Sequence, residues 1–236
     1  MVVVASSAVA AATFVNLGTA SSFAVLAGSG ITNTGPTLID GDIGTYPTIT
    51  ISGAGSMTVA GTNHGGDAVT QGAKSDLLTA YTTAAGQIPT SPIVADLGGT
   101  TLNSGVYRSA SSIGLTGTLT LDAQGNPNAV FVFQSSSTLT TASASSVSLV
   151  NGAQACNVFW QVSSSATLGT NSTFRGNVLA QTSITVTTGT TVVGRMLASN
   201  GAVTLNTNSI TAPFCAAAHP LRRDRDRCSF FDPDRD

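Results

Sequence analysis

Few side chains in this sequence could perform acid–base, nucleophilic or metal-centred chemistry. The 236 residues include eleven acidic residues, all Asp, with two His and three Cys. Asp40 and Asp42 could bind Ca²⁺, but that ion takes ~6–8 oxygen ligands, so a turn in which the carboxylates accept backbone hydrogen bonds is favoured. His64 and His219 stand apart, and no Cys or His spacing is typical of zinc. The sequence therefore predicts a protein that is not an enzyme and has no metal or cofactor.

Two arginines and a set of aromatic residues raise the question of carbohydrate chemistry. A polysaccharide lyase would use an arginine such as Arg175 or Arg195 beside clustered acids, but residues 159–213 contain no Asp or Glu. We expect the two arginines to stack along one corner of the fold and cover it with their stems. The aromatic residues occur at strand spacing and are predicted to lie in the core or against a helix. They are Phe131, Phe133, Phe159, Trp160 and Phe174.

Composition narrows the fold to the all-β class. Only 8% of the residues are charged, against ~25% in an ordinary soluble domain, and the formal net charge is −2. Such a chain has no basic field for nucleic acid or an anionic membrane, and 42% hydrophobic residues is the wrong composition for disorder. Lys74 is the only lysine, Glu is absent, and 25 glycines accompany an excess of Thr. These features argue against a helical bundle and favour strands joined by Gly and Asn turns.

The two ends of the chain differ from its body. Residues 1–12 are small and apolar with an Ala-x-Ala pattern, which indicates the remnant of a secretory signal peptide; the alternative is a frayed apolar terminus. Residues 216–236 hold five Arg and five Asp without periodicity and are expected to be a disordered tail. The domain is therefore placed at residues 13–215, and the protein is expected to be secreted. No run reaches the ~18 apolar residues that span a bilayer.

The body of the chain repeats with a period of 18 to 19 residues. Residues 24–34 resemble residues 177–187, and each repeat has three short β-like runs separated by small residues. The aligned late segments are 159–177, 178–195 and 196–213, with weaker copies at 115–122 and 130–141. One repeat is then one coil of a three-sided β-solenoid, which buries its apolar side chains only by stacking on neighbouring coils.

One segment departs from the repeat. Residues 67–87 carry apolar side chains at helical spacing, with Asp67 placed to cap the helix and Gly86 and Pro89 placed to end it. The apolar stripe of this helix must pack on one side of the solenoid. Residues 53–66, just before it, are rich in glycine and are predicted to form a loop or cap over one end of the solenoid.

Alternation within the strands separates inward from outward side chains. Ile31, Ala166, Ile184 and Val203 are predicted to point inward. Their outward neighbours are Gly30, Thr32, Ser165, Thr167, Ser183, Thr185, Thr187, Ala202, Thr204 and Asn206. These side chains would form a flat grid of methyls and hydroxyls, spaced ~6.6 Å along a strand and ~4.8 Å between strands. Such a grid suits a layer of ordered water, although outward Thr is also simply favourable in exposed strands.

Several stretches, found in the same order along the chain, resemble one known family. They are residues 15–28 (VNLGTASSFAVLAG), 39–47 (IDGDIGTYP), 115–122 (LTGTLTLD), 131–134 (FVFQ), 157–162 (NVFWQV) and 194–198 (GRMLA). The resemblance is to the secreted microbial ice-binding (antifreeze) proteins of the DUF3494 type, and it covers about residues 13–215. It implies a discontinuous right-handed three-sided β-helix with one α-helix packed alongside, in which the N-terminal coil stacks beside late coils.

The resemblance also implies adsorption to ice crystals through one flat face, which slows ice growth and recrystallisation. Family members with a regular face carry a Thr-Ala/Gly-x-Thr/Asn pattern. Residues 182–185 (TSIT) match it except at Ser, whereas 29–32, 164–167 and 201–204 depart at one or two positions. The Thr residues at 32, 167, 185 and 204 are expected to touch ice, while Gly30, Ser183 and Ala202 keep the face flat. The expected partner is the ice surface, and the protein is expected to be a monomer.

Two questions stay open at the level of sequence. In an exported protein Cys156 and Cys215 could form a disulfide, and two buried free thiols are an equal alternative. The alternative function is a non-enzymatic cell-surface adhesive or glycan-binding module that uses the same solenoid as a spacer.

Overall fold

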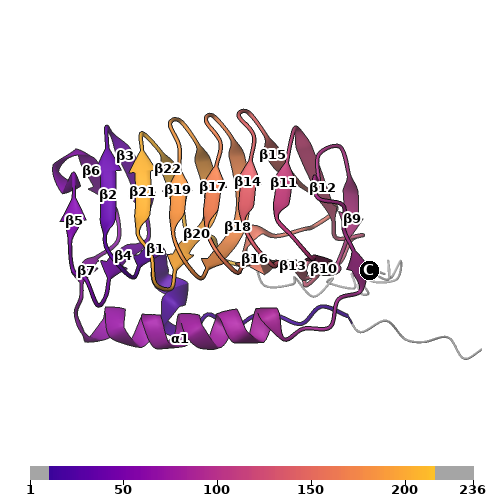
Figure 1. Cartoon of the computed structure of the whole chain (residues 1–236), viewed down its shortest axis with the longest axis horizontal. Helices are drawn as coiled ribbons and strands as arrows, with labels where there is room; N and C mark the ends of the chain where they lie inside the picture. The colour runs from indigo at the N-terminus through magenta and orange to yellow at the C-terminus, as the bar shows by residue number, and fades with distance from the viewer. Residues whose placement is uncertain (1–10, 216–236) are drawn as a thin grey trace, which may run out of the picture.

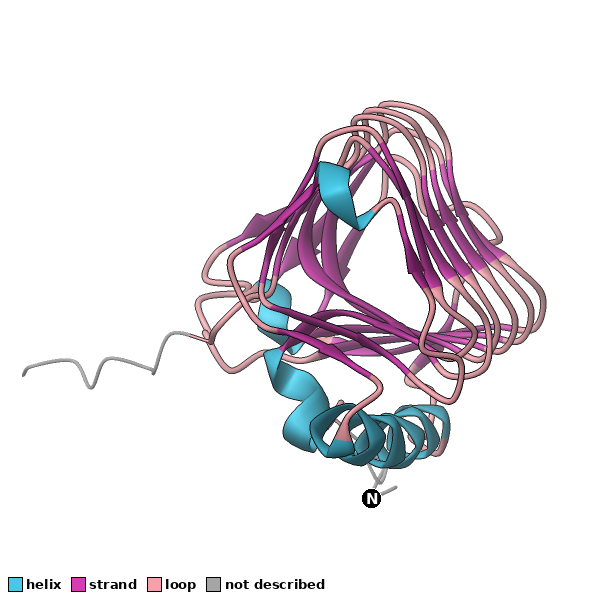
Figure 2. Cartoon of the chain, turned by 90° about the vertical axis from the view of Figure 1, so that its left-hand side faces the viewer, coloured by secondary structure: helices cyan, strands magenta, loops and turns pink. Residues whose placement is uncertain are grey.

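Residues 11–215 are described in the computed structural model, and they form a three-sided parallel β-helix with one long helix alongside (Figure 1). Seen along its axis, the solenoid has a triangular cross-section (Figure 2). Strands of neighbouring coils pair in parallel and in register, as β13 (Phe131–Ser135) does with β16 (Val158–Val162). The predicted all-β solenoid with a packed helix is confirmed.

Each side of the triangle is a stack of strands. The side that we call the threonine face is the seven-stranded sheet of β11 (Ile113–Leu115), β14 (Leu139–Thr141), β17 (Ala166–Leu168), β19 (Ile184–Val186), β21 (Val203–Asn206), β2 (Ile31–Thr34) and β5 (Ile51–Ser52). The helix face holds β8 (Ser91–Pro92), β10 (Gly105–Ser109), β13, β16, the later parts of β18 (Thr173–Ala180) and β20 (Thr191–Ala198), β1 (Phe23–Ala27), β4 (Asp42–Thr45) and β7 (Asn63–Gly65). The third face holds β9 (Thr101–Asn103), β12 (Thr118–Asp122), β15 (Ser146–Val150), the earlier parts of β18 and β20, β22 (Ser209–Thr211), β3 (Thr37–Asp40) and β6 (Met57–Val59).

The order of the coils in space differs from their order in sequence. The coil of β1, β2 and β3 stacks directly on the last coil, because β1 pairs with β20, β2 with β21 and β3 with β22. Residues 46–66 continue from β4 into an end coil of β5, β6 and β7, which includes a short 3-10 helix, Ala54–Ser56. The predicted cap at residues 53–66 is therefore a further coil with strands of its own.

The helix α1 (Ala68–Ala85) carries the chain from that end coil to the opposite end of the solenoid (Figure 1). The Asp67 carboxylate caps the helix by accepting a hydrogen bond of 2.9 Å from Thr70 N. Ala73, Leu77, Ala80 and Ala84 are buried at spacings of three or four residues, which is the period that places them on one side of the helix. They pack against the helix face together with the 3-10 helix Gly18–Ser22, and that side of the solenoid is thereby covered.

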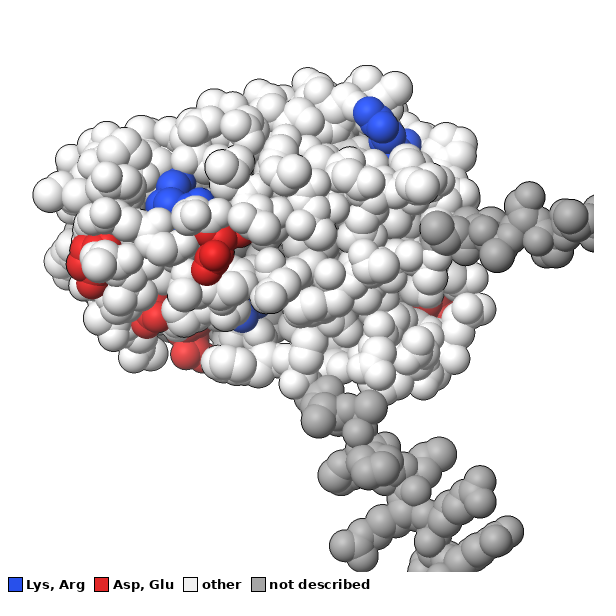
Figure 3. All heavy atoms as spheres, turned by 90° about the horizontal axis from the view of Figure 1, so that it is seen from below, with Lys and Arg blue, Asp and Glu red and all other residues white. Residues whose placement is uncertain are grey.

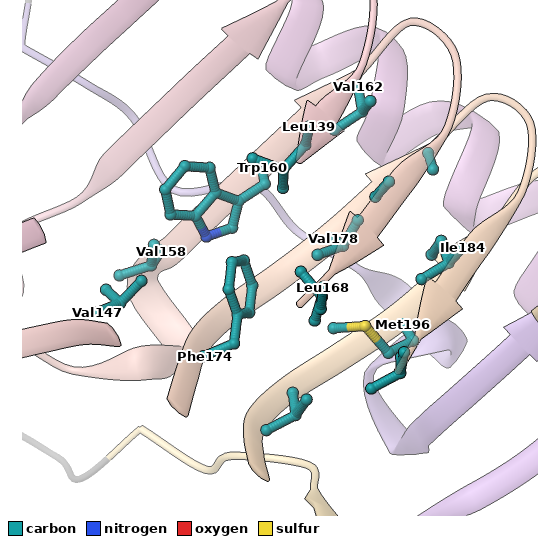
Figure 4. Close-up of a cluster of buried hydrophobic side chains, with 14 of the residues drawn as sticks. Leu139, Val147, Val158, Trp160, Val162, Leu168, Phe174, Val178, Ile184 and Met196 are labelled. Atoms are coloured by element: carbon teal, nitrogen blue, oxygen red, sulfur yellow. The ribbon is translucent and has the colours of Figure 1, made fainter. Parts of the chain in front are cut away.

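The interior of the solenoid is filled by one continuous apolar cluster (Figure 4). The Trp160 ring stacks on the Phe133 ring at a centroid distance of 4.0 Å. The centroid of the Phe174 ring, from the coil on the other side, lies 5.3 Å from that of Trp160. The indole Nε1 donates a hydrogen bond to Arg175 O. All five aromatic residues that the sequence assigned to the core or to helix packing are at most 1% exposed, which confirms that interpretation.

The corner between the threonine face and the third face uses a left-handed residue in coil after coil. Gly117, Ala144, Asn171, Gly189, Thr207 and Gly35 all have positive φ there. Gly189 also has little space for a side chain, since a Cβ there would meet the Asn171 Oδ1 atom of the preceding coil. Because the same corner is repeated in each coil, the strands that follow it start at equivalent positions and pair in register.

The structure contradicts one prediction about single residues, the stacking of two arginines, and decides one question that the sequence left open, the state of two cysteines. Arg175 and Arg195 do not stack, because Gly176 pairs with Gly194 and leaves Arg175 opposite Val193 and Arg195 opposite Asn177. Arg195 is buried and Arg175 lies half-buried on the third face. Cys156 and Cys215 form a disulfide that ties the last described residue to the 3-10 helix Ala155–Asn157. The tail at 216–236 and most of the predicted signal remnant at 1–12 lie outside the described residues.

Candidate functional site

The threonine face presents one straight row of small and hydroxylated residues. Ile31, Ala166, Ile184 and Val203 point inward as predicted and are at most 1% exposed, so their neighbours along each strand point outward. The row runs, strand by strand, through Gly114, Thr140, Thr167, Thr185, Thr204, Thr32 and Ser52, each in register with the next. No register shift interrupts any of these pairs, and the row is therefore regular across all seven strands.

The hydroxyls of this row are free to meet solvent. Within residues 11–215, the side-chain hydroxyls of the five Thr in the row form no hydrogen bond with another protein group. Other Thr side chains of the same coils are used internally: Thr190 Oγ1 donates to Gly169 O at 2.8 Å, and Thr141 Oγ1 accepts from Gly169 N at 2.8 Å. The row is thus one continuous line of threonines whose side-chain hydrogen-bonding capacity is left for water.

A column of smaller residues lies on one side of the row. It includes Ser165, Ser183 and Ala202, all half-buried. Gly30, at the same position in the first coil, is buried, because the neighbouring Thr50 carbonyl oxygen lies 3.1 Å from where a Cβ would stand. Gly30 therefore makes room for the next coil and offers almost no surface of its own.

The other side of the row is less uniform. Thr187 is half-buried and its hydroxyl donates to Leu168 O at 2.7 Å, so this side chain offers its methyl rather than its hydroxyl. Asn206 is also half-buried, and its Oδ1 accepts from Thr207 Oγ1. Thr34 is in register with Asn206 and is exposed. This column therefore departs from the repeat more than the central row does.

Sequence reasoning missed the two ends of the row. Gly114 on β11 and Thr140 on β14 extend it at one end, and Ser52 on β5 extends it at the other, beyond the four coils that were predicted. The alternation in Leu139-Thr140-Thr141 was the available signal for β14, since its inward and outward positions match Ile184-Thr185-Val186. Ser52 gave no such signal, because its strand is only two residues long.

The remaining sides of the solenoid differ from this face in charge. No outward residue on the seven strands is charged, whereas the third face carries Arg175, Asp40 and Asp122 and an exposed Leu38. Seen from the helix side, most of the visible charged side chains gather toward the end where α1 begins (Figure 3). No helix within residues 11–215 has both the length and the hydropathy to cross a membrane.

The acidic and His residues singled out in the sequence have local structural contacts. Asp42 Oδ1 accepts a hydrogen bond of 2.8 Å from Thr62 N, as expected for a turn carboxylate. His64 lies between two carboxylates, with Nδ1 2.9 Å from Asp67 and Nε2 3.6 Å from Asp42. Within the described part of the chain no group of three or more His, Cys, Asp or Glu side chains is arranged to hold a metal ion.

The fold and this face together define a helix-braced β-solenoid whose open flat side, rather than a cleft, is its candidate binding surface. The sequence model of the ice-binding-like family matches residues 25–211, which is most of the chain. The chain therefore belongs to the ice-binding-like family.

Individual relatives agree with that membership. An ice-binding protein of Nostoc sp. (strain HG1) is 52% identical over 203 residues, covering 85% of this chain and 75% of the relative. One from Colwellia sp is 38% identical and covers 84% of both chains. The crystal structure of an ice-binding protein from an Antarctic biological consortium has a TM-score of 0.85 at 46% identity, covering 87% of this chain and 94% of that one. That of Antarctomyces psychrotrophicus has a TM-score of 0.83 at 45% identity, with 86% and 100% covered. The glycan-binding alternative gains no support from these proteins.

Proposed function

We propose that this protein binds ice through the threonine face and is not an enzyme. The observation that carries the proposal is the row of in-register Thr residues whose hydroxyls have no protein partner and which no charged residue interrupts. Methyl groups order the water around them, and hydroxyls anchor that water by hydrogen bonds. A repeated pair of the two can hold a layer of water ordered enough to join a crystal, which would slow ice growth and recrystallisation.

The other two faces are less suited to binding ice, one because it is covered and the other because it carries charged side chains. The helix face is buried under α1 and the 3-10 helix Gly18–Ser22. The third face also carries hydroxyls, but the charged Arg175 and Asp40 hold their own hydration, and Leu38, on the same strand as Asp40, is 57% exposed. The threonine face is the side that is both open and uniform. We assign the contact to Thr32, Thr140, Thr167, Thr185 and Thr204, flanked by Ser165, Ser183, Thr187, Ala202 and Asn206.

The protein is further proposed to act outside the cell, as a monomer. The disulfide between Cys156 and Cys215 supports an oxidising compartment. A single flat face on one chain is sufficient for adsorption to a crystal, and the contact needs no second copy.

A pair of matched substitutions tests the assignment. Thr185→Tyr places a ring in the middle of the row, while Thr191→Tyr makes the same change at an exposed position on the third face of the same coil. Recrystallisation inhibition and crystal shaping are measured for both, with thermal melting to show that each is folded. We expect Thr185→Tyr to lose activity and Thr191→Tyr to keep it. Equal activity in the two folded variants would show that another surface binds ice, and a folded wild type without effect on ice would overturn the function itself.

A further inference from the structure

The first coil and the last coil meet at a junction that the polypeptide does not cross. We use this name for the contact of β1, β2 and β3 with β20, β21 and β22. The row on the threonine face passes over the junction between Thr204 and Thr32, and continues to Ser52. Two of the seven strands of the face therefore depend on how the first coil is placed against the last.

The repeat itself does not fix that placement. Ile31-Thr32 in β2 has the same inward and outward pattern as Ile184-Thr185 and Val203-Thr204. Because side chains alternate with a period of two, a slip of two residues would keep apolar groups inside and hydroxyls outside. Hydrophobic burial alone thus gives several registers of the first coil on the last coil a similar energy. Residues that break the repeat must then select one of these registers.

The first such group lies inside the corner between the threonine face and the third face. Asn33 is buried where the paired residue of the last coil is Leu205. Thr37 Oγ1 donates to Asn33 Oδ1 at 2.6 Å and accepts from Asn208 N at 3.2 Å, across 171 residues of sequence. The side chain of Asn208 continues this chain of bonds by donating to Thr187 O at 2.8 Å. The network spans three coils and crosses the junction.

A cation that is at least half-buried stands at each of the other two corners. Lys74, from α1, donates to Ala198 O at 2.6 Å and Ser199 O at 2.5 Å, just before the turn in which Gly201 O accepts from Ser29 N. Arg195 donates to Ser21 O at 2.8 Å, immediately before β1.

These two cations are costly to bury. The ion pairs among residues 11–215 all involve His64, so neither cation has a carboxylate partner there. Arg195 is 4% exposed, and its guanidinium donates only to uncharged oxygens, those of Ser21, Asn177 and Pro213. Burial of a cation without a carboxylate partner normally opposes folding. In some proteins, buried polar groups of this kind favour one arrangement of the fold over its competitors.

We propose that Thr37 with Asn33 and Asn208, Lys74, and Arg195 are positioning residues that clasp the three corners of the junction and hold the first coil in the register that makes the ice-binding row continuous. The proposal rests on the proposed function of the threonine face. None of these side chains belongs to the row. They act by keeping Thr32 aligned with Thr204, so that adsorption extends over the whole face rather than over the five strands on one side of the junction.

The test uses two clasp variants, each with a matched control away from the junction. Thr37→Val removes a buried hydroxyl at the junction, and Thr190→Val removes an equally buried one that donates to Gly169 O between two continuous coils. Lys74→Met cuts a link between helix and solenoid at the junction, and Gln161→Met cuts the link to Tyr81 elsewhere on the helix. Amide hydrogen exchange by NMR and recrystallisation inhibition are measured on the full chain, below the melting temperature.

Amides that bond across the junction report on it directly, and they include those of Ser29, Val203 and Thr207. We expect them to exchange faster in the two clasp variants by roughly ten- to hundredfold, the factor that one lost hydrogen bond to a charged or buried group represents. The amide of Ile184, which bonds between continuous coils, should not change. Recrystallisation inhibition should require more protein in the clasp variants than in the controls.

Three results would overturn the proposal: unchanged exchange at the junction, faster exchange spread evenly over all coils, or full inhibition of recrystallisation despite an opened junction. A wild type without effect on ice would contradict the proposed function instead, and the exchange pattern would still decide whether the clasps hold the junction.

Discussion

Lys74 gives the stability of the fold an unusual dependence on pH. Burial against the solenoid lowers the pKa of this amine from 10.5 to about 8. Below pH 8 the folded and unfolded chains are both protonated there, and Lys74 contributes no slope. Between about pH 8 and 10.5 the unfolded chain binds the proton and the folded chain does not, so the free energy of unfolding rises with pH. At ~1.4 kcal/mol per pH unit, the gain is at most about 3 kcal/mol.

Two features reduce that gain. Two carbonyl oxygens accept hydrogen bonds from the ammonium group and favour its charged form. Solvent also reaches part of the side chain, which is half-buried. We therefore expect an increase of about 1–2 kcal/mol across this window.

Urea denaturation at about pH 7.5, 8.5 and 9.5, followed by the fluorescence of Trp160, measures the effect. Lys74→Met should lose the slope, because no group remains at that position to titrate. Burial also lowers the pKa of Arg195, to about 10, and raises the pKa of Tyr107, so measurements stay below pH 10 to keep these groups out of the window. A wild-type stability that falls over this range, or a slope that persists in Lys74→Met, would refute the reasoning.

Three further outcomes are expected. Trp160→Ala should lower the free energy of unfolding by about 3–5 kcal/mol in a denaturant titration, because it empties a fully buried site between two other rings; a loss below about 1 kcal/mol would mean that the stack collapses to fill the space. Replacing Cys156 and Cys215 together by Ser should cost about 2–4 kcal/mol in the same titration, since their bond closes a loop with a sequence separation of 59, and an unchanged midpoint would show that the C-terminal end is held by other contacts. Recrystallisation inhibition should be constant from about pH 5 to 8, because no titratable residue points outward on the threonine face, and a clear pH optimum would place the contact elsewhere.

The coils and the inward side chains could be predicted from the sequence because both follow from local alternation. Ile184 between Ser183 and Thr185 has one orientation that buries its side chain, and stacking of similar coils then places Thr185 beside its counterparts. The helix was predictable for the same reason, since Asp67 and the spacing of Ala73 and Leu77 are local signals.

Features that depend on a neighbouring coil could not be predicted in this way. The burial of Gly30 results from the backbone of Thr50, which belongs to a different coil. The positions of Arg175 and Arg195 depend on the pairing of Gly176 with Gly194 between neighbouring coils, which sets Arg175 opposite Val193 rather than opposite Arg195. Ala144 and Thr207 adopt left-handed backbone conformations that their residue types disfavour, because each fills a corner position shared by all the coils.

The threonine face and the junction place opposite demands on the sequence. The face needs the same outward residue in every coil. Because the strands are then alike, their side chains do not by themselves determine the register of the first coil against the last. A solenoid built by an unbroken chain avoids the problem, since each coil is delivered to its neighbour by the turn before it. Here α1 carries the chain to the far end, and the last coil returns to the first without a covalent guide. The first coil is therefore placed by residues that do not repeat: Asn33, a polar residue in a core position of β2, and Lys74, which reaches the last coil from α1.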